Sequence, residues 1–283
     1  MKNYSCSMFY SFELHELKSL LKEAFKVLGF TPNIMTIYAD LDQIIEDKPF
    51  NETLFFSFLD KNPTKLQVTN KIYDENGDYF RFSLTINKDY NISLLNWSNC
   101  NLDFLIKKEY FNFFLGSSFF ICGYCYDIND SFFQTTEDVD YFKFNLPTQP
   151  YKTRKNYLGE PVIDVSKHWG RIERVCGLEF LAAPLMWFGL EYFKIISKEE
   201  LLKFRFSSEI NLLNNNIIQI KLFDIYDSPM IPENRNKQKE FWDFFKFEKK
   251  LNIYKERVMK EVPIDPSKSI QDYILRMKQK RKK

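Results

Sequence analysis

The sequence predicts an α+β fold in which a largely antiparallel sheet has flanking helices and a C-terminal amphipathic helix. Three observations predict it. Strand-like runs are spread along the whole chain, helical periodicity is clearest near both ends, and Asn-Gly in DENGD (74–78) separates two β-rich runs. Asn-Gly between such runs is a strong hairpin signal. Strands that do not alternate regularly with helices favour an antiparallel sheet.

The first half of the chain begins with a predicted strand at 4–12. Apolar residues then recur at helical spacing over 13–28, and a glycine and a proline in LGFTP end this helix. The run at 34–46 is mixed in signal. Further strands are predicted at 52–60, in the hairpin 65–87 and at 90–97.

The second half begins with a short predicted helix at 102–114 and a strand at 117–127. The polar stretch 128–160 predicts loops around a short helix or strand. Ser197 and Glu200 have the spacing of a capping box, which predicts a helix at 197–204. The remaining expectations are a strand and turn at 161–177, a buried apolar run at 178–196, a strand at 214–225, one long amphipathic helix at 236–261 and a last helix at 269–278.

We find no internal repeat and no low-complexity linker, so we expect a single α+β domain over 1–283. Two subdomains, 1–100 and 101–262, are the alternative. Residues 263–283 form a basic C-terminal tail.

Composition and charge narrow the functional classes. Phe, Tyr, Ile, Asn and Lys dominate, which is typical of an AT-rich bacterial or phage genome. The N-terminus lacks the pattern of a signal peptide and no run is apolar enough to span a membrane, so we expect a cytoplasmic protein. The net charge is +2, but the last eight residues carry six positive charges, which leaves about −4 on the rest. The tail makes nucleic acid a candidate partner through six residues: Arg276, Lys278, Lys280, Arg281, Lys282 and Lys283.

Cys122 and Cys125 have the spacing of a zinc or thiol-redox motif within FFICGYCYD. The flanking residues favour a strand, in which residues three apart point to opposite faces. The pair therefore indicates a buried strand. A mixed site that adds His168 and Cys176 is the alternative, and we expect no cofactor and no metal.

Two stretches are the richest in chemistry, the acidic loop at 126–141 and DVSKHWGRIERVCG at 164–177. Trp and Arg are favoured anchors in binding sites, and an acidic surface attracts a basic partner. We predict that nine residues form a partner-binding surface: Asp127, Asp130, Glu137, Asp138, Asp140, His168, Trp169, Arg171 and Glu173. An enzymatic alternative is a metal-dependent nuclease that uses the 127–140 carboxylates and His168. Phosphate-binding glycine motifs and the GxSxG elbow are absent from the sequence.

The runs ICGYCYDINDSFFQTTEDVDYF and VIDVSKHWGRIERVCGLEFLAAPLMWFGLEYF carry a resemblance over about 120–205. In them, a MWFG-like turn (Met186–Gly189) follows a Gly-Arg turn (Gly170–Arg171). This arrangement resembles uncharacterised bacterial immunity-type proteins associated with polymorphic-toxin loci. The resemblance implies a cytosolic, non-enzymatic protein that blocks a toxin by steric occlusion, and the same logic suits a phage inhibitor of a host defence enzyme.

Overall fold

A computed structural model of the chain describes residues 4–11, 14–28, 34–39, 43–60, 65–73, 79–87, 90–99, 106, 108–145, 151–156, 158–213 and 216–261. The predicted helix at 269–278, the basic tail, the hairpin turn at 74–78 and Cys100 lie outside these residues. Within them, no helix combines the length and the apolar character needed to cross a membrane.

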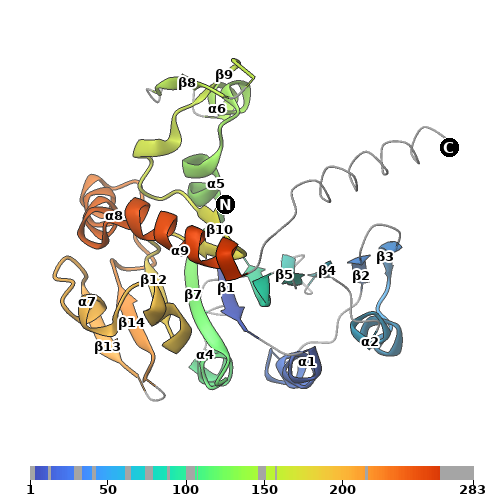
Figure 1. Ribbon diagram of the computed structural model, residues 1–283. Coiled ribbons are helices and arrows are strands. Elements are labelled where there is room, and N and C mark those ends of the chain that lie inside the picture. The colour runs from blue at the N-terminus through green and yellow to red at the C-terminus, as the bar shows by residue number, and fades with distance from the viewer. Residues whose placement is uncertain are drawn as a thin grey trace.

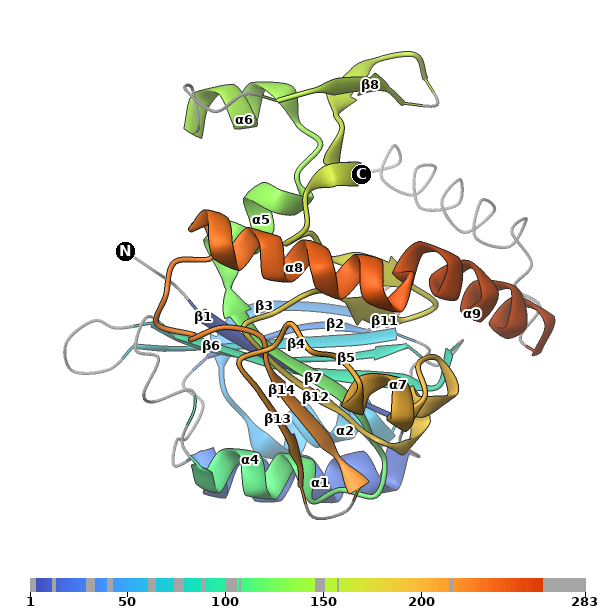
Figure 2. The ribbon, with the colours of Figure 1, turned by 90° about the vertical axis from the view of Figure 1, so that its left-hand side faces the viewer.

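Ten strands of the described residues form one sheet, in the order β13-β14-β12-β7-β1-β6-β5-β4-β2-β3 (Figures 1 and 2). Every neighbouring pair in it is antiparallel. The strands are β1 (Tyr4–Tyr10), β2 (Ile34–Ala39), β3 (Gln43–Pro49), β4 (Lys65–Tyr73), β5 (Tyr79–Asn87), β6 (Ile92–Asn99), β7 (Phe120–Asp127), β12 (Leu185–Phe188), β13 (Glu209–Leu212) and β14 (Ile218–Lys221). Two small ribbons pair β8 (Thr153–Lys155) with β9 (Pro161–Ile163), and β10 (Glu173–Val175) with β11 (Leu178–Phe180).

Helices cover both faces of the sheet, which confirms the predicted α+β class (Figure 2). They are α1 (Leu14–Leu28), α2 (Glu52–Asp60), α4 (Lys108–Leu115), α5 (Ile128–Thr135), α6 (Val139–Asn145), α7 (Lys198–Leu202), α8 (Pro232–Phe245) and α9 (Phe247–Glu261), with 3-10 helices η2 (Val165–Lys167) and η3 (Leu190–Lys194).

The alternation of side chains along the central strands produces two cores. In β1, Met8 and Tyr10 pack with residues of α1, α2 and α4, whereas Phe9 between them packs with residues of α8 and α9. Successive strand residues point to opposite faces of a sheet. The sheet therefore has an apolar core on each face. On the face of Phe9 the apolar core covers only part of β1, since Ser5 and Ser7 on the same face accept hydrogen bonds from Asn96.

The prediction of a strand at 52–60 is wrong, because this segment forms the helix α2. Asn51 accepts a hydrogen bond from the Leu54 N–H at 2.8 Å and so caps the helix. Phe55, Phe56, Phe58 and Leu59 are buried, at the spacing of one helical face. Tertiary packing on this face overrides the strand preference of the aromatic residues.

The single helix predicted at 236–261 is two helices, since the chain takes a left-handed conformation at Lys246 (φ 49°). Two residues apart on one straight helix, Phe245 and Phe247 would face about 200° apart. The break brings both rings into the same core, with centroids 5.8 Å apart.

The predicted capping box of α7 is confirmed. The Ser197 side chain accepts a hydrogen bond from the backbone N–H of Glu200, and the Glu200 side chain accepts one from the backbone N–H of Ser197.

The quoted MWFG motif is not a turn. Met186 to Phe188 lie in the buried strand β12, and the chain leaves the sheet only at Gly189. A Cβ atom at Gly189 would lie 2.5 Å from the carbonyl oxygen of Phe120 on the neighbouring strand, so only glycine fits there.

The segment 136–164, of which the structure describes 136–145, 151–156 and 158–164, stands away from the sheet beyond α8 (Figures 1 and 2). We call it the arm; it contains α6, β8 and β9. Phe142 and Ile163 are buried within it, and the Ile163 N–H donates to the carbonyl of Glu137 at 2.9 Å. These two residues belong to neither main core, and Phe142 also stacks on His168 outside the arm.

Candidate recognition site

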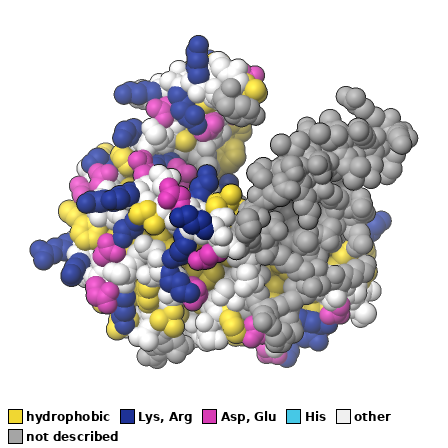
Figure 3. All heavy atoms as spheres, viewed as in Figure 1, with side chains coloured by type: hydrophobic (Ala, Val, Ile, Leu, Met, Phe, Trp, Pro, Cys, Tyr) yellow, Lys and Arg dark blue, Asp and Glu magenta, His cyan; other side chains and the backbone are white. Residues whose placement is uncertain are grey.

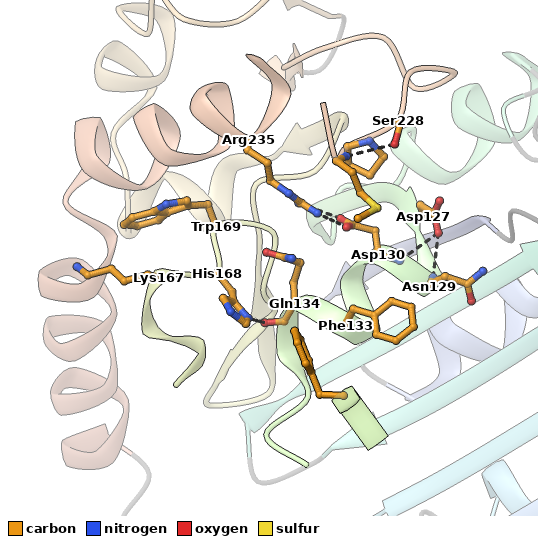
Figure 4. A pocket seen from close by; sticks show the side chains of 13 residues that line it. Asp127, Asn129, Asp130, Phe133, Gln134, Lys167, His168, Trp169, Ser228 and Arg235 are labelled. Carbon is orange, nitrogen blue, oxygen red and sulfur yellow. Dashed lines mark hydrogen bonds and ion pairs between the residues drawn. The ribbon is translucent and has the colours of Figure 1, made fainter. Parts of the chain in front are cut away.

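A cavity of about 490 Å³ lies where α5, the 167–169 loop and the 228–235 segment meet at the base of the arm (Figure 4). Its walls are formed by Asp127, Asn129, Asp130, Phe133, Gln134, Phe142, Lys167, His168, Trp169, Ser228, Pro229, Met230 and Arg235. Four of the nine predicted surface residues line it: Asp127, Asp130, His168 and Trp169. The cavity thus unites the acidic loop with the Trp–His stretch.

Asp127 and Asp130 have different roles on this wall. Asp127 accepts hydrogen bonds from the N–H groups of Asn129 and Asp130, at 2.9 and 3.2 Å, and is the N-cap of α5. Asp130 forms a bidentate ion pair with Arg235 of α8, with one contact of 3.0 Å. Arg235 also donates to Gln238 at 2.6 Å. The pair joins the wall of the cavity to α8.

Burial raises the pKa of the Asp130 carboxyl, and the hydrogen bonds and charge of Arg235 act in the opposite direction. Gly170 makes room for this pair. A Cβ atom there would lie 2.6 Å from Nη1 of Arg235 and 3.3 Å from a carboxylate oxygen of Asp130. A larger residue at 170 would require the guanidinium of Arg235 to shift.

His168 closes the arm side of the cavity. Its Nδ1 lies 3.2 Å from the carbonyl oxygen of Gln134, and its ring stacks on Phe142. Burial lowers the pKa of His168, which the bond to Gln134 offsets in part and the Arg235 charge reinforces. At neutral pH the ring is therefore neutral. Because a carbonyl can only accept, Nδ1 carries the proton and Nε2 is an acceptor.

Arg171 is buried inside the loop, with only 3% of its side chain exposed. Its guanidinium donates hydrogen bonds to the carboxylate of Glu173 at 2.7 Å and to the backbone carbonyls of Ser166 and His168 at 3.1 and 3.2 Å. It also lies 4.2 Å from the ring centroid of Trp242, a cation–π distance. Glu173 is thus engaged with Arg171, and this pair holds the loop in shape.

Trp169 belongs to the rim of the cavity. Its carbonyl accepts a hydrogen bond from the indole N–H of Trp242 at 2.9 Å. The ammonium groups of Lys167 and Lys239 lie 5.6 and 5.9 Å from its ring centroid. The rim is therefore an aromatic surface with positive charges beside it.

The other predicted acidic residues lie on the arm instead. Glu137 pairs with Arg154 of β8, and Asp138 accepts from the Tyr141 N–H at 2.8 Å as the first turn of α6 forms. Asp140 is exposed in that first turn. The structure thus divides the acidic loop between the cavity and the arm.

The exposed side of α6 combines aromatic and acidic residues. The Phe144 side chain is 86% exposed, and Tyr141 one turn before it is exposed as well. The ring of Tyr141 lies 5.0 Å from that of Phe132, an exposed residue of α5. We call Phe132, Tyr141 and Phe144, with Asp138 and Asp140, the aromatic face. Figure 3 shows the arm standing above the body with acidic, basic and apolar side chains on its surface.

The structure confirms that Cys122 and Cys125 point to opposite faces of the sheet. Cys122 lies in the core under α8 and α9, and Cys125 in the core over α1 and α4. His168 lies in the cavity wall, and within the described ranges no three His, Cys, Asp or Glu side chains gather as a metal-binding group. The arrangement gives no geometric support to the mixed zinc site or to the nuclease alternative.

The arrangement suits recognition of a polar or aromatic group. It offers a neutral histidine acceptor, an aromatic rim and a carboxylate already paired with an arginine.

The sequence did not predict that Arg235, Gln134 and the 228–230 segment belong to the cavity. Arg235 lies 105 residues from its partner Asp130, and no local pattern marks it.

Comparisons with known proteins identify no family. No family model matches the chain, and no curated protein matches it. Among solved structures, the chain is similar to the Pseudomonas aeruginosa T6SS protein PA0821, with a TM-score of 0.43 and 10% sequence identity over 93% of this chain and 86% of that one. A likeness of this size carries no inference about function.

Proposed function

We propose that this chain is a non-enzymatic, immunity-type inhibitor that binds a toxin through the aromatic face of its arm and blocks it by occlusion. The observation that carries the proposal is Phe144, which is 86% exposed on α6 of the arm. A phenylalanine held in water by an ordered element loses hydrophobic stabilisation that a partner can restore. Aromatic residues are also the most frequent anchors of protein interfaces.

The charges of the aromatic face fit the same partner class. Asp138 and Asp140 come just before Tyr141 in the chain and are exposed. Toxins that act on nucleic acid carry basic surfaces, and acidic side chains speed the encounter with such surfaces. Anchoring by aromatic rings and steering by carboxylates are therefore available on one helix.

The first experiment captures the partner at the aromatic face. Phe144 is replaced by a photo-crosslinking phenylalanine analogue, and the tagged chain is irradiated in its source cells. The matched control carries the same analogue at Leu190, which is 58% exposed but belongs to η3. We expect one protein to be crosslinked from position 144 and not from position 190.

The second experiment tests inhibition. The captured protein should be toxic when produced alone and harmless when co-produced with the wild-type chain. Phe144→Ser should raise the Kd by about 30-fold or more, as expected for loss of a hot spot of about 2 kcal/mol. The variant should also fail to protect the cells. Leu190→Ser should protect like wild type. Full protection by Phe144→Ser, with an unchanged Kd, contradicts the proposal.

A further inference from the structure

Two cysteines on neighbouring central strands lie in direct contact. Cys6 of β1 stands opposite Cys125 of β7 in the antiparallel register. The Cys6 thiol donates to the sulfur of Cys125 at 2.9 Å, and both side chains are completely buried. This contact is separate from the cavity and from the aromatic face.

The strand geometry meets the requirements of a disulfide. Opposite residues of an antiparallel pair have Cα atoms about 4.5 or 5.5 Å apart, and disulfides span Cα distances of about 4.4 to 6.8 Å. The sulfur atoms must approach from 2.9 Å to the roughly 2.05 Å of a bond. We expect rotation of the two side chains to supply this approach.

We propose that Cys6 and Cys125 form an interior disulfide that ties β1 to β7 when the chain folds in the presence of a disulfide oxidant such as glutathione disulfide. One cysteine thiolate attacks the glutathione disulfide and releases one glutathione thiolate. The second cysteine then attacks the mixed disulfide and releases the other. The two cysteines lose two electrons and two protons, and the oxidant becomes two glutathione thiols.

The timing of oxidation follows from burial. Burial and the contact with Cys125 raise the pKa of the Cys6 thiol, so the folded chain holds almost no thiolate there. The thiolate is the reacting species in thiol–disulfide exchange. We therefore place the reaction during folding, before the strands close around the sulfurs.

Cys122 is a natural control on the same strand. It is also completely buried, but it points to the other core, where the residues opposite it on β1 and β12 are Phe9 and Phe188. No sulfur of the described residues faces it across these strands. Burial alone therefore does not produce the arrangement of Cys6 and Cys125.

The test uses the full chain, reduced and unfolded, then refolded with either a glutathione/glutathione disulfide mixture or reduced glutathione alone. Thiols are alkylated under denaturing conditions, and peptides are identified by mass spectrometry. We expect a Cys6–Cys125 linked peptide, lighter by two hydrogen atoms, only after refolding with the disulfide, while Cys122 and Cys176 are alkylated. The linked protein should unfold at a higher urea concentration, because the bond closes a long loop.

Variants separate the pairing from general oxidation. Cys6→Ser should remove the linked peptide, and Cys122→Ser should retain it. The inference is overturned if the wild-type chain refolds with the disulfide to the same circular dichroism spectrum but with Cys6 and Cys125 both alkylated. It is equally overturned if either cysteine is found linked to Cys100 instead.

Discussion

The side chains of Asp130 and Arg235 form a bidentate ion pair that joins α5 in the cavity wall to α8. Both are largely removed from water, with 11% and 20% of their side chains exposed. Removing a charge from water is costly unless its partner is also present. Asp130 thus depends on a residue 105 positions away, and Gly170 leaves the space in which they meet.

We expect Arg235→Met to destabilise the fold by about 2–3 kcal/mol at neutral pH, less than the roughly 3–5 kcal/mol of a fully buried broken pair, because the site is partly exposed. The pKa of Asp130 is already raised in the folded state, and loss of Arg235 raises it further. The folded state then binds the proton more tightly than the unfolded state, so stability falls as the pH rises through the folded pKa. The deficit of the variant should therefore shrink as the pH falls toward the unfolded value of 3.8.

Urea unfolding at pH 7 and at about pH 4.5 measures this dependence. The double variant Asp130→Asn, Arg235→Met is the control, because it leaves no unpaired carboxylate and should recover much of the loss. An equal deficit of the single variant at both pH values would show that Arg235 acts through packing alone.

At the residue scale, the sequence indicated which stretches lie at the cavity, but not which of their side chains are already engaged in interactions within the protein. Asp127, Asp130, His168 and Trp169 do line one cavity, because both chemically dense stretches lie at its edge. The sequence also proposed Arg171 as a binding anchor, whereas the structure places it in the interior. Residue type shows that an arginine can recognise a partner, but only three-dimensional packing shows whether its charge is already used.

Among the elements, local patterns predicted several strands and one capped helix correctly, and two predictions failed where tertiary packing decides the conformation. The strands at 4–12 and 117–127, the hairpin strands at 65–87 and the capped helix at 197–204 all occur. The segment 52–60 was misassigned, because its buried face forms only against the rest of the core. The break between α8 and α9 has the same origin, since Lys246 is a good helix former and packing of two phenylalanines determines its conformation.

Lys246 gives a direct test of this break. A left-handed conformation costs a non-glycine residue about 1–2 kcal/mol, and glycine adopts it without that cost. We expect Lys246→Gly to be more stable than Lys246→Ala by about 1 kcal/mol in urea unfolding. Both variants remove the same charge, so their difference isolates the backbone. If alanine is equal or better, the chain does not need the left-handed conformation at this position.

For the whole molecule, the position of β1 is the decisive feature. This strand comes from the N-terminus but lies between β6 and β7 in the middle of the sheet. The two cores lie on opposite faces of that one sheet, and Cys6 and Phe9 of β1 belong to different cores. Loss of β1 would therefore expose apolar surface on both faces at once.

We therefore expect the two halves, 1–100 and 101–262, to unfold together. Native-state hydrogen exchange should give the same global opening free energy for amides of β6, in the first half, and β12, in the second. Far-UV and near-UV circular dichroism should also give one coincident urea transition. A lower opening free energy in one strand, with a second transition, would support two subdomains. The arm is the matched internal reference, because its buried residues Phe142 and Ile163 belong to neither main core and it should open at a lower free energy without unfolding the sheet. Amide hydrogen exchange in the arm should slow when a partner covers the aromatic face. The same experiment therefore reports whether the sheet unfolds as one unit and where the partner binds.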